Sequence, residues 1–478
     1  MPRAYDAVVV GAGPNGLAAA IALARAGHPV LVVEANDTIG GGCRTAEVTL
    51  PGFHHDVCAA VLPMGIVSPF LQGLPLQQFG LTWIQPPAAL AHPFEDGTAA
   101  VLYRSLEATA ATIETDGAAW IRLMQPFLRH WPAFADSVLR PIRIPRHPWL
   151  MARFGLQGLR SGAALARATF TGEKARAFFA GCAAHSILPM DAPGSASFGL
   201  VLALAGHAVD WPIVRGGSQR LTDAMAAYFQ SLGGEIRTSH AVRRLVDLPP
   251  YRAALFDVMP AAMEQIAGDA LPASYRQRLR GYRHGPGVFK LDWALRAPIP
   301  WKAPECATAA TVHLGATLDE ITDSEDGASR GRIAERPFVL VAQQSLFDAS
   351  RAPRGAHTGW AYCHVPRGSA TDMTERIERQ VERVAPGFRD LIIARSVMAP
   401  AAVEARNANM VGGDVAGGAN DLAQFMFRPL VRWNPYTTPN KQLFLCSSAT
   451  PPGGGVHGMC GYWAAQAVLR YFENSRGG

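Results

Sequence analysis

The stretch VVVGAGPNGLAAAIALARAG, residues 8–27, decides the fold. It is apolar enough to pass for a signal peptide or half of a membrane span, but Gly11, Gly13 and Gly16 interrupt it. The valines before the glycines are typical of a buried strand, and the alanine-rich run after them is typical of a helix. A second apolar run then ends at Glu34. The glycines therefore lie between a strand and a helix in a β-α-β unit of about 30 residues, which is the dinucleotide-binding fingerprint.

The spacing of these glycines has a chemical reason. Gly11 permits a tight turn, Gly13 lets the backbone approach a pyrophosphate, and Gly16 lets the helix pack close to the strand. The first turn of the helix presents unpaired N–H groups and a partial positive charge to phosphates. Glu34 follows Gly16 by 18 residues, where a carboxylate can hold ribose hydroxyls. A signal peptide needs none of these features.

Two further glycine clusters favour FAD over NAD as the dinucleotide. The first is NDTIGGGCRT, residues 36–45, in which Arg44 can neutralise a pyrophosphate. The second lies near the C-terminus, where the pattern predicts a strand at 443–446, a glycine loop at 453–455 and a helix over about 456–471. Because no second G-x-G-x-x-G follows a strand, we expect one tightly held FAD and no separate NAD domain.

The segments AVVVGAGPNGLAAAIALARAG, VVEANDTIGGGCRT and CSSATPPGGGVHGMCGYWAA resemble the phytoene desaturase-like family of FAD-dependent oxidoreductases, within the flavin amine oxidase group. The resemblance covers almost the whole chain. It implies an α/β fold with a Rossmann-type FAD-binding domain built from discontinuous segments, a mixed-sheet substrate domain and a helical insertion. The family's antiparallel excursion before AALFDV is shortened here, so contacts to the adenine are expected to differ.

The resemblance also implies which residues bind FAD. The pyrophosphate, ribose, adenine and flavin contacts fall, in chain order, on Gly11, Gly13, Pro14, Asn15, Gly16, Glu34, Ala35, Gly41, Gly42, Cys43, Arg44, Val242, Gly454, Gly455, Val456 and His457.

The same comparison divides the chain into three regions. Residues 1–70, 205–265 and 425–478 are expected to form the FAD-binding domain, 71–204 a helical insertion or lid, and 266–424 a mixed α+β substrate domain. Within the last region the residue pattern predicts strands and one amphipathic helix, which together enclose an apolar cavity against the flavin.

The stretch from residue 120 to 170 is basic and aromatic. Its only acidic residue is Asp136, and it carries Arg122, Arg129, Arg140, Arg143, Arg146, Arg153, Arg160 and Arg167. Such a segment either lies on an anionic bilayer or forms a solvated helical lid whose aromatic side chains face the core. The sequence leaves both interpretations open, so peripheral contact with a membrane is one expectation for this chain.

The expected chemistry is hydride transfer between an apolar carbon–carbon substrate and FAD, in either direction. FAD accepts the hydride, and the protein supplies position and polarity. His457 and Tyr462 are the catalytic candidates, although His457 could equally cap the helix that follows it. An amine oxidase and a non-catalytic FAD-stabilised binding protein are the alternatives. The chain carries no H-E-x-x-H or nucleophile motif, so we expect no metal.

Composition bounds these hypotheses. The chain has 478 residues, 49% hydrophobic and 17% charged, with a net charge of +6. Its seven cysteines form no C-x-x-C pair, which predicts reduced thiols in a cytosolic protein. No uninterrupted apolar run reaches about 18 residues, so no transmembrane helix is expected. We expect a small-molecule substrate rather than nucleic acid.

Overall fold

A computed structural model describes residues 5–475 of the chain. The N-terminal fingerprint lies in a five-stranded sheet with the order β16-β10-β1-β2-β9, and every pairing in it is parallel. Its strands are β1 (Tyr5–Val10), β2 (Val30–Val33), β9 (Glu235–Arg237), β10 (Tyr251–Phe256) and β16 (Leu443–Leu445). Segments from the start, middle and end of the chain therefore build one sheet, as the sequence predicted.

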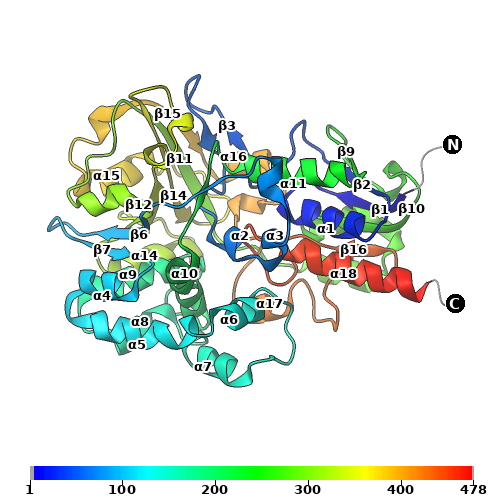
Figure 1. The fold of residues 1–478 in the computed structure, drawn as a ribbon, viewed down its shortest axis with the longest axis horizontal. Helices are drawn as coiled ribbons and strands as arrows, with labels where there is room; N and C mark the ends of the chain where they lie inside the picture. Colours follow the sequence, from blue (N-terminus) through cyan, green and yellow to red (C-terminus); the bar gives the residue numbers. More distant parts are fainter. Residues whose placement is uncertain (1–4, 476–478) are drawn as a thin grey trace.

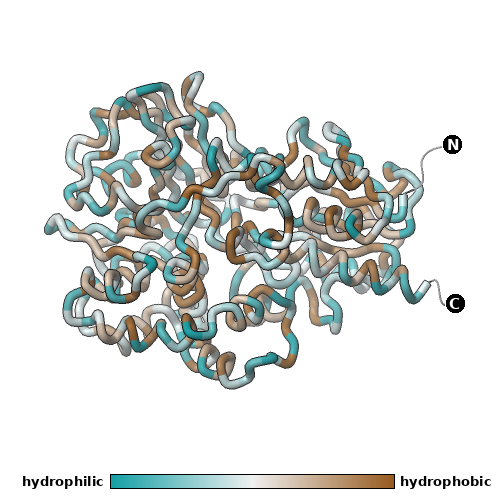
Figure 2. Tube along the Cα trace, viewed as in Figure 1, coloured by the Kyte–Doolittle hydropathy of each residue, from teal (hydrophilic) through white to brown (hydrophobic). Residues whose placement is uncertain are grey.

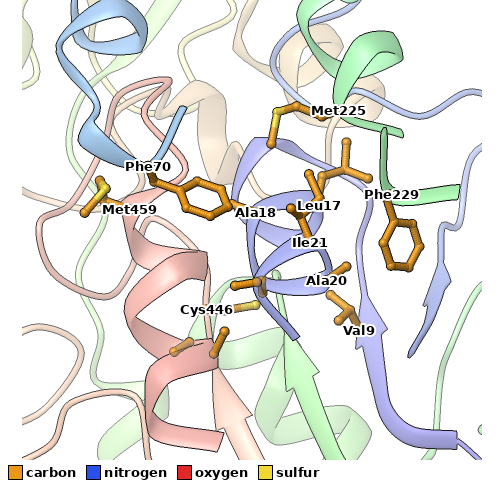
Figure 3. Packing of buried hydrophobic residues seen from close by; sticks show 14 of the residues in the cluster. Val9, Leu17, Ala18, Ala20, Ile21, Phe70, Met225, Phe229, Cys446 and Met459 are labelled. Carbon is orange, nitrogen blue, oxygen red and sulfur yellow. The ribbon is translucent and has the colours of Figure 1, made fainter. Parts of the chain in front are cut away.

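The helix after the glycines, α1 (Pro14–Arg25), is buried on nearly every side. It packs along α18 (Met459–Asn474), and a Cβ built on Gly461 would lie 1.8 Å from the carbonyl oxygen of Asn15. The two helices can meet at backbone contact only because that position is glycine. Leu17 and Ile21 fill the space toward α11 (Gln219–Ser231) (Figure 3).

A second sheet of seven strands forms the other half of the molecule. Its order is β15-β11-β14-β13-β12-β6-β7. Its strands are β6 (Ala88–Pro93), β7 (Ala99–Leu102), β11 (Gly287–Leu295), β12 (Ala309–Leu314), β13 (Val339–Ala342), β14 (His357–Val365) and β15 (Ile392–Met398). Only the pairing of β12 with β6 is parallel, so the sheet is mixed, as expected.

Strands β6 and β7 correct one expectation. They lie within 71–204, where the sequence pattern predicted mostly helices, and they join the second sheet instead. A hairpin turn at Asp96-Gly97, with Gly97 at φ 85°, connects them, and Asp-Gly between two short apolar runs is a known hairpin signal. The insertion therefore shares a sheet with the proposed substrate domain, and the domain bounds remain a prediction.

The remaining part of the insertion is helical. These helices are α4 (Leu106–Thr112), α5 (Gly117–Leu128), α6 (Trp131–Val138), α7 (Pro148–Gly158), α8 (Gly162–Thr169), α9 (Glu173–Ala184) and α10 (Ser195–Val209). Figure 1 shows them below the mixed sheet, and it shows the parallel sheet and both termini at the right of the view. Within residues 5–475, no helix combines the length and the apolar character needed to span a bilayer.

Shorter elements connect the two halves. The helices are α2 (Pro63–Val67), α3 (Pro69–Gln72), α12 (Pro260–Ala267), α13 (Ala273–Arg280), α14 (Leu318–Ser329), α15 (Thr374–Val384), α16 (Pro400–Arg406) and α17 (Leu422–Phe427). Two-stranded pairs are formed by β3 (Thr45–Ala46) with β4 (His55–Asp56) and by β5 (Trp83–Ile84) with β8 (Ile213–Val214). Figure 2 shows the hydrophobic residues along α1 and the parallel strands beneath it.

Two local details concern the expected site. Helix α18 begins at Met459, three residues later than the sequence pattern suggested, because Gly458 takes a left-handed conformation at φ 67° and ends the preceding loop. Between β9 and β10 the chain makes only a short 3-10 turn at Leu245–Asp247, so the excursion there is short, as expected.

Candidate cofactor and active site

The glycine turn after β1 is tightly constrained. Gly11 has φ 105°, which favours glycine, and a Cβ built on Gly16 would lie 2.0 Å from the carbonyl oxygen of Gly11. Gly13 caps α1 without any side-chain hydrogen bond. A Cβ built on Gly41 would lie 3.0 Å from the Cα of Gly13, so the two glycine clusters touch. The glycines themselves therefore place no side chain over the backbone at the start of α1, as a phosphate cradle requires.

Glu34 holds this turn in place. One carboxylate oxygen accepts a hydrogen bond of 2.9 Å from the N–H of Ala12. The other oxygen accepts bonds of 3.0 Å and 2.7 Å from the backbone and side-chain N–H groups of Asn36. Arg44 places a guanidinium nitrogen 3.8 Å from the same carboxylate. Glu34, the residue expected to bind ribose, is thus buried directly after β2. Its hydrogen bonds also order the loop around it.

Sequence reasoning missed Asp257, which follows the end of β10. Its Oδ2 accepts a hydrogen bond of 2.8 Å from the N–H of Gly16. A Cβ built on Gly13 would lie 3.0 Å from the same oxygen. Burial raises the pKa of Asp257 well above its usual range, and the nearby charge of Glu34 raises it further. Its position at the carboxyl edge of the parallel sheet is the signal that could have found it.

The polar groups left open here, one acceptor and one donor, fit a dinucleotide. The Oδ1 atom of Asn15 and the Nε atom of Arg44 are buried and lack hydrogen-bond partners among the described residues. Together with the helix N-terminus and the glycine backbone, they offer polar and cationic groups without a side chain in the way. A pyrophosphate is the anion that such a cradle accommodates.

A cavity of about 340 Å³ begins at this cradle. At one end it is lined by Gly13, Gly42, Asp257 and Gly454, and at the other by Leu202, Trp211 and Leu340. A second hollow of about 950 Å³ adjoins it. The two share Arg44 and Val57, and the second reaches Asn36 and Thr238 beside Glu34. The two hollows therefore lie side by side and reach from Asn36, beside Glu34, to the apolar wall at Leu202, Trp211 and Leu340.

Lys290 on β11 is a second residue that the sequence analysis missed. It lines the cavity, pairs with the carboxylate of Asp292, and lies 5.7 Å from the ring centroid of Trp360. Burial raises the pKa of Asp292, and the charge of Lys290 opposes that shift. His55 lies behind this pair, with Nδ1 3.5 Å from Asp292. The strand GVFKLDWAL is buried along its whole length, and a Lys and an Asp two positions apart on such a strand are a signal of function.

His457 serves the helix rather than the cavity. Its Nδ1 accepts a hydrogen bond of 3.0 Å from the N–H of Met459, so the ring caps α18. The hydroxyl of Ser68 donates to its carbonyl oxygen. Burial lowers the pKa of His457 to about 4, so the ring is neutral at pH 7. The preceding Gly455 and Val456 line the cavity.

Seven other expected residues do not line the described cavities: Gly11, Gly16, Glu34, Ala35, Cys43, Val242 and Tyr462. Tyr462 packs against Phe70, with ring centroids 5.2 Å apart. Tyr462 lies on α18, where the sequence placed it, and its catalytic role stays a prediction. Val242 packs against the core beside the parallel sheet, Cys43 is enclosed, and Ala35 is exposed. Pro14, Gly41 and Arg44 line the cavity, as expected.

Comparisons with known proteins agree with this geometry. The NAD(P)-binding Rossmann-like domain family matches residues 9–72. The rat pyridine nucleotide-disulfide oxidoreductase domain-containing protein 2 is 27% identical over 98% of this chain and 94% of its own length. One of the limonene dehydrogenase polypeptides of Castellaniella defragrans is 24% identical over 97% and 94%, and a phytoene desaturase of Fusarium fujikuroi is 26% identical over 73% and 64%.

Solved structures share the fold. An oxidoreductase from Methanosarcina mazei superposes with a TM-score of 0.66 at 16% identity, covering 97% of this chain and 99% of that chain. A putrescine oxidase bound to putrescine gives 0.62 at 18% identity, with 100% of both chains covered. At 16% and 18% sequence identity, the structural similarity establishes the fold alone.

The fold and the site together define a dinucleotide-binding oxidoreductase. The chain is similar to members of the phytoene desaturase-like and flavin amine oxidase superfamily. Oxidoreductase chemistry and an FAD cofactor, both expected from the sequence, are properties of this superfamily, and those expectations are confirmed at that level.

Proposed function

We propose that this chain is an FAD-dependent dehydrogenase that transfers hydride between an apolar carbon–carbon substrate and FAD. The observation that carries the proposal is the continuity of one cavity from Gly13 and Asp257 to an apolar wall at Leu202 and Leu340. Two relatives whose names denote action on hydrocarbons, the limonene dehydrogenase polypeptide and the phytoene desaturase, support it.

We assign the cofactor contacts as follows. The backbone from Gly11 to Gly16 would hold the pyrophosphate, with Arg44 as the counter-charge. Glu34 would bind the ribose beside the hollow that reaches Asn36. Gly454, Gly455 and Val456 would contact the flavin end, because they line the cavity opposite the second sheet. When bound, FAD supplies the acceptor for the hydride.

Residues of the second sheet, of α10 and of the segment after it would position the substrate and accept its proton. Leu202, Trp211 and Leu340 exclude water and orient an apolar chain. Loss of a hydride from one carbon leaves a proton to be lost from its neighbour, so a basic atom must face the cavity. Lys290 lines the cavity beside Asp292, whose pKa is raised by burial, so we assign the acceptance of that proton to this pair.

Amine oxidation is the second candidate. Trp360 and Tyr362 line the cavity and pack edge to face, with centroids 5.1 Å apart and planes at 80°. Such a pair can enclose a neutral amine. The test for both candidates is anaerobic mixing of the FAD-loaded protein with apolar alkenes and alkanes or with primary amines. Loss of the oxidised-flavin absorbance with the hydrocarbons supports the dehydrogenase, and loss with amines alone supports the oxidase. Retained colour with every compound supports the binding protein.

Peripheral contact with an anionic bilayer is part of the proposal. Within 120–170, Trp120 and Phe134 are enclosed in the helical core, as the lid interpretation required. Ile144 and Trp149, however, are 92% and 87% exposed. They stand among Arg143, Arg146 and Arg153 at the start of α7, an arrangement typical of a surface that enters the headgroup layer.

A further inference from the structure

The cavity wall follows one row of side chains across the second sheet. Lys290 pairs with Tyr362, Tyr362 with Leu340, and Leu340 with His313, on four neighbouring strands. Adjacent strands lie about 4.8 Å apart, so the row measures about 14 Å from Lys290 to His313. The first three residues of the row line the cavity, and Thr311, two positions before His313 on the same face of β12, lines it too. The cavity is therefore elongated along this row.

Polar atoms gather where the row reaches β12. His185 follows α9 and lines the cavity, and its Nε2 lies 3.0 Å from the Nε2 of His313. The Nδ1 of His185 and the Oγ1 of Thr311 take part in no hydrogen bond with the described residues, and neither is among the fully enclosed polar atoms. Both atoms are thus available to a molecule in the cavity.

The surroundings of these two atoms are apolar. Leu202, Leu340 and Trp211 line this end, and the ring of Trp211 stands edge-on to His185 with centroids 5.8 Å apart. A hydrocarbon in contact with His185 and Thr311 would leave their polar atoms buried without partners, which is unfavourable. An oxygen on an otherwise apolar molecule would satisfy both.

The charge at this end identifies the kind of oxygen. Burial lowers the pKa of His185 to about 3, and burial also lowers the pKa of His313 well below its usual range. Both rings are therefore neutral at pH 7. The cationic residues of the described lining are Lys290, at the opposite end of the row from His313, and Arg44 and Arg406, whose side chain and backbone are hydrogen-bonded beside the cradle. A carboxylate at His185 would be buried without a counter-charge, whereas a hydroxyl is accommodated.

We propose that the cavity binds an elongated apolar molecule with one neutral oxygen at its end, held by His185 and Thr311 while the opposite end faces the glycine cradle. The proposal rests on the proposed function for its choice of site and names the substrate class for it. An alcohol fits best, because its hydroxyl can donate to one of these atoms and accept from the other.

Binding of three probes of equal chain length tests this proposal without turnover. Decanol, decane and decanoate are titrated into the FAD-loaded protein, and binding is read from the fluorescence of the tryptophans that line the cavity. We expect decanol to bind about tenfold more tightly than decane, the value of one satisfied hydrogen bond in a buried site. We expect decanoate to bind more weakly than decanol.

Three variants locate the oxygen. His185→Phe puts another aromatic ring at this position but removes both ring nitrogens, so the preference for decanol over decane should disappear. His185→Gln and Thr311→Val should each retain part of it, and His147→Phe, an exposed histidine, is the matched control. Bound FAD and an unchanged unfolding midpoint show that each variant is folded.

Equal binding of decanol and decane by the wild-type protein would overturn the proposal. So would a full preference for decanol in His185→Phe, tighter binding of decanoate than of decanol, or no binding of any probe to the FAD-loaded protein. Failure of the proposed function appears elsewhere, as flavin that no apolar compound reduces, and leaves these binding ratios readable.

Discussion

The backbone N–H of Gly16 donates a hydrogen bond of 2.8 Å to the carboxylate of Asp257, which lies 241 positions later in the chain. This bond joins the first turn of α1 to the carboxyl end of β10 and so closes the cradle between two parallel strands. A carboxylate at this point also lies where phosphates are expected, so its charge matters as much as its geometry.

Substitutions of Asp257 should separate geometry from charge. Asp257→Asn keeps an oxygen that accepts from Gly16 and removes the carboxylate, so we expect FAD binding to be retained or improved. Asp257→Leu leaves a buried N–H unpaired and should weaken FAD binding by about tenfold or more. FAD content and titration of FAD fluorescence measure both. Asp269→Asn, at an exposed carboxylate, is the control, and equal FAD affinity in Asp257→Leu and wild type would contradict the assignment.

Gly13 and Gly16 should respond differently to alanine. Gly13 has φ −76°, which any residue adopts, so Gly13→Ala should fold normally and lose FAD affinity because its Cβ enters the cradle. Gly16→Ala should destabilise the chain by about 3 kcal/mol, since its Cβ would overlap the oxygen of Gly11. Denaturant unfolding and FAD titration distinguish the two outcomes. Gly155→Ala, with open space around it in α7, should be neutral or slightly stabilising.

The buried pair of Lys290 and Asp292 gives a stability prediction. Lys290→Met strands a buried carboxylate and should cost about 3 kcal/mol of unfolding free energy. The double variant with Asp292→Asn should recover most of that loss, while flavin reduction by substrate stays slow. Arg167→Ala, which breaks an exposed pair with Asp319, should change stability by less than about 1 kcal/mol. A double variant no more stable than Lys290→Met would argue against the pair as a unit.

Acid should destabilise the protein through its buried histidines. Burial lowers the pKa of five of them to about 3 or 4: His55, His92, His185, His207 and His457. The ordinary pKa of a histidine is 6.5, and in the folded chain the pKa of His92 is about 4. Between these two pH values the histidine binds a proton in the unfolded chain but not in the folded one. Its contribution to stability is therefore complete above pH 6.5 and is lost progressively as the pH falls from 6.5 toward 4.

One variant isolates the contribution of a single histidine, His92, to this pH dependence of stability. His92→Gln keeps a donor for the carbonyl of Gly315 and cannot titrate. Between pH 6 and pH 5 its unfolding free energy should fall less steeply than that of the wild type, by about 1.4 kcal/mol per pH unit. His147→Gln at an exposed site should leave the slope unchanged. Parallel slopes for His92→Gln and wild type would show that His92 is not neutral and buried.

The exposed apolar residues of α7 and its preceding loop predict vesicle binding. The protein should co-sediment with anionic vesicles more than with zwitterionic ones, and added salt should weaken the binding. Trp149→Ala and Ile144→Ser should each reduce it several-fold. Val246→Ser removes an apolar side chain that is 78% exposed in another part of the chain and should have no effect. Binding that survives both substitutions would place the contact elsewhere.

Sequence reasoning succeeded where the signal was local. The first glycine turn, Glu34 and the returning strand follow from spacing within about 30 residues, and the C-terminal strand followed from its apolar run. The hairpin of β6 and β7 was missed because short alanine-rich runs resemble helices unless the Asp96-Gly97 turn is given weight.

The site was harder to predict because its residues meet only through tertiary structure. Asp257 has no motif of its own, and its role comes from a partner 241 positions away. Lys290 lies on a strand whose nine residues are all buried, so alternation could not show which face it occupies. Tyr462 and His457 flank the start of α18, where the conformation of Gly458 set the register that put Tyr462 against Phe70.

The central claim is that one FAD occupies the cradle between Gly13 and Asp257. The most direct measurement is the flavin released from the purified, denatured chain, quantified by absorbance and identified by mass. We expect about one FAD per chain in the wild type, and clearly less in Gly13→Ala with the fold preserved. A colourless wild-type protein that takes up no added FAD, or an equal FAD content in both proteins, would contradict it.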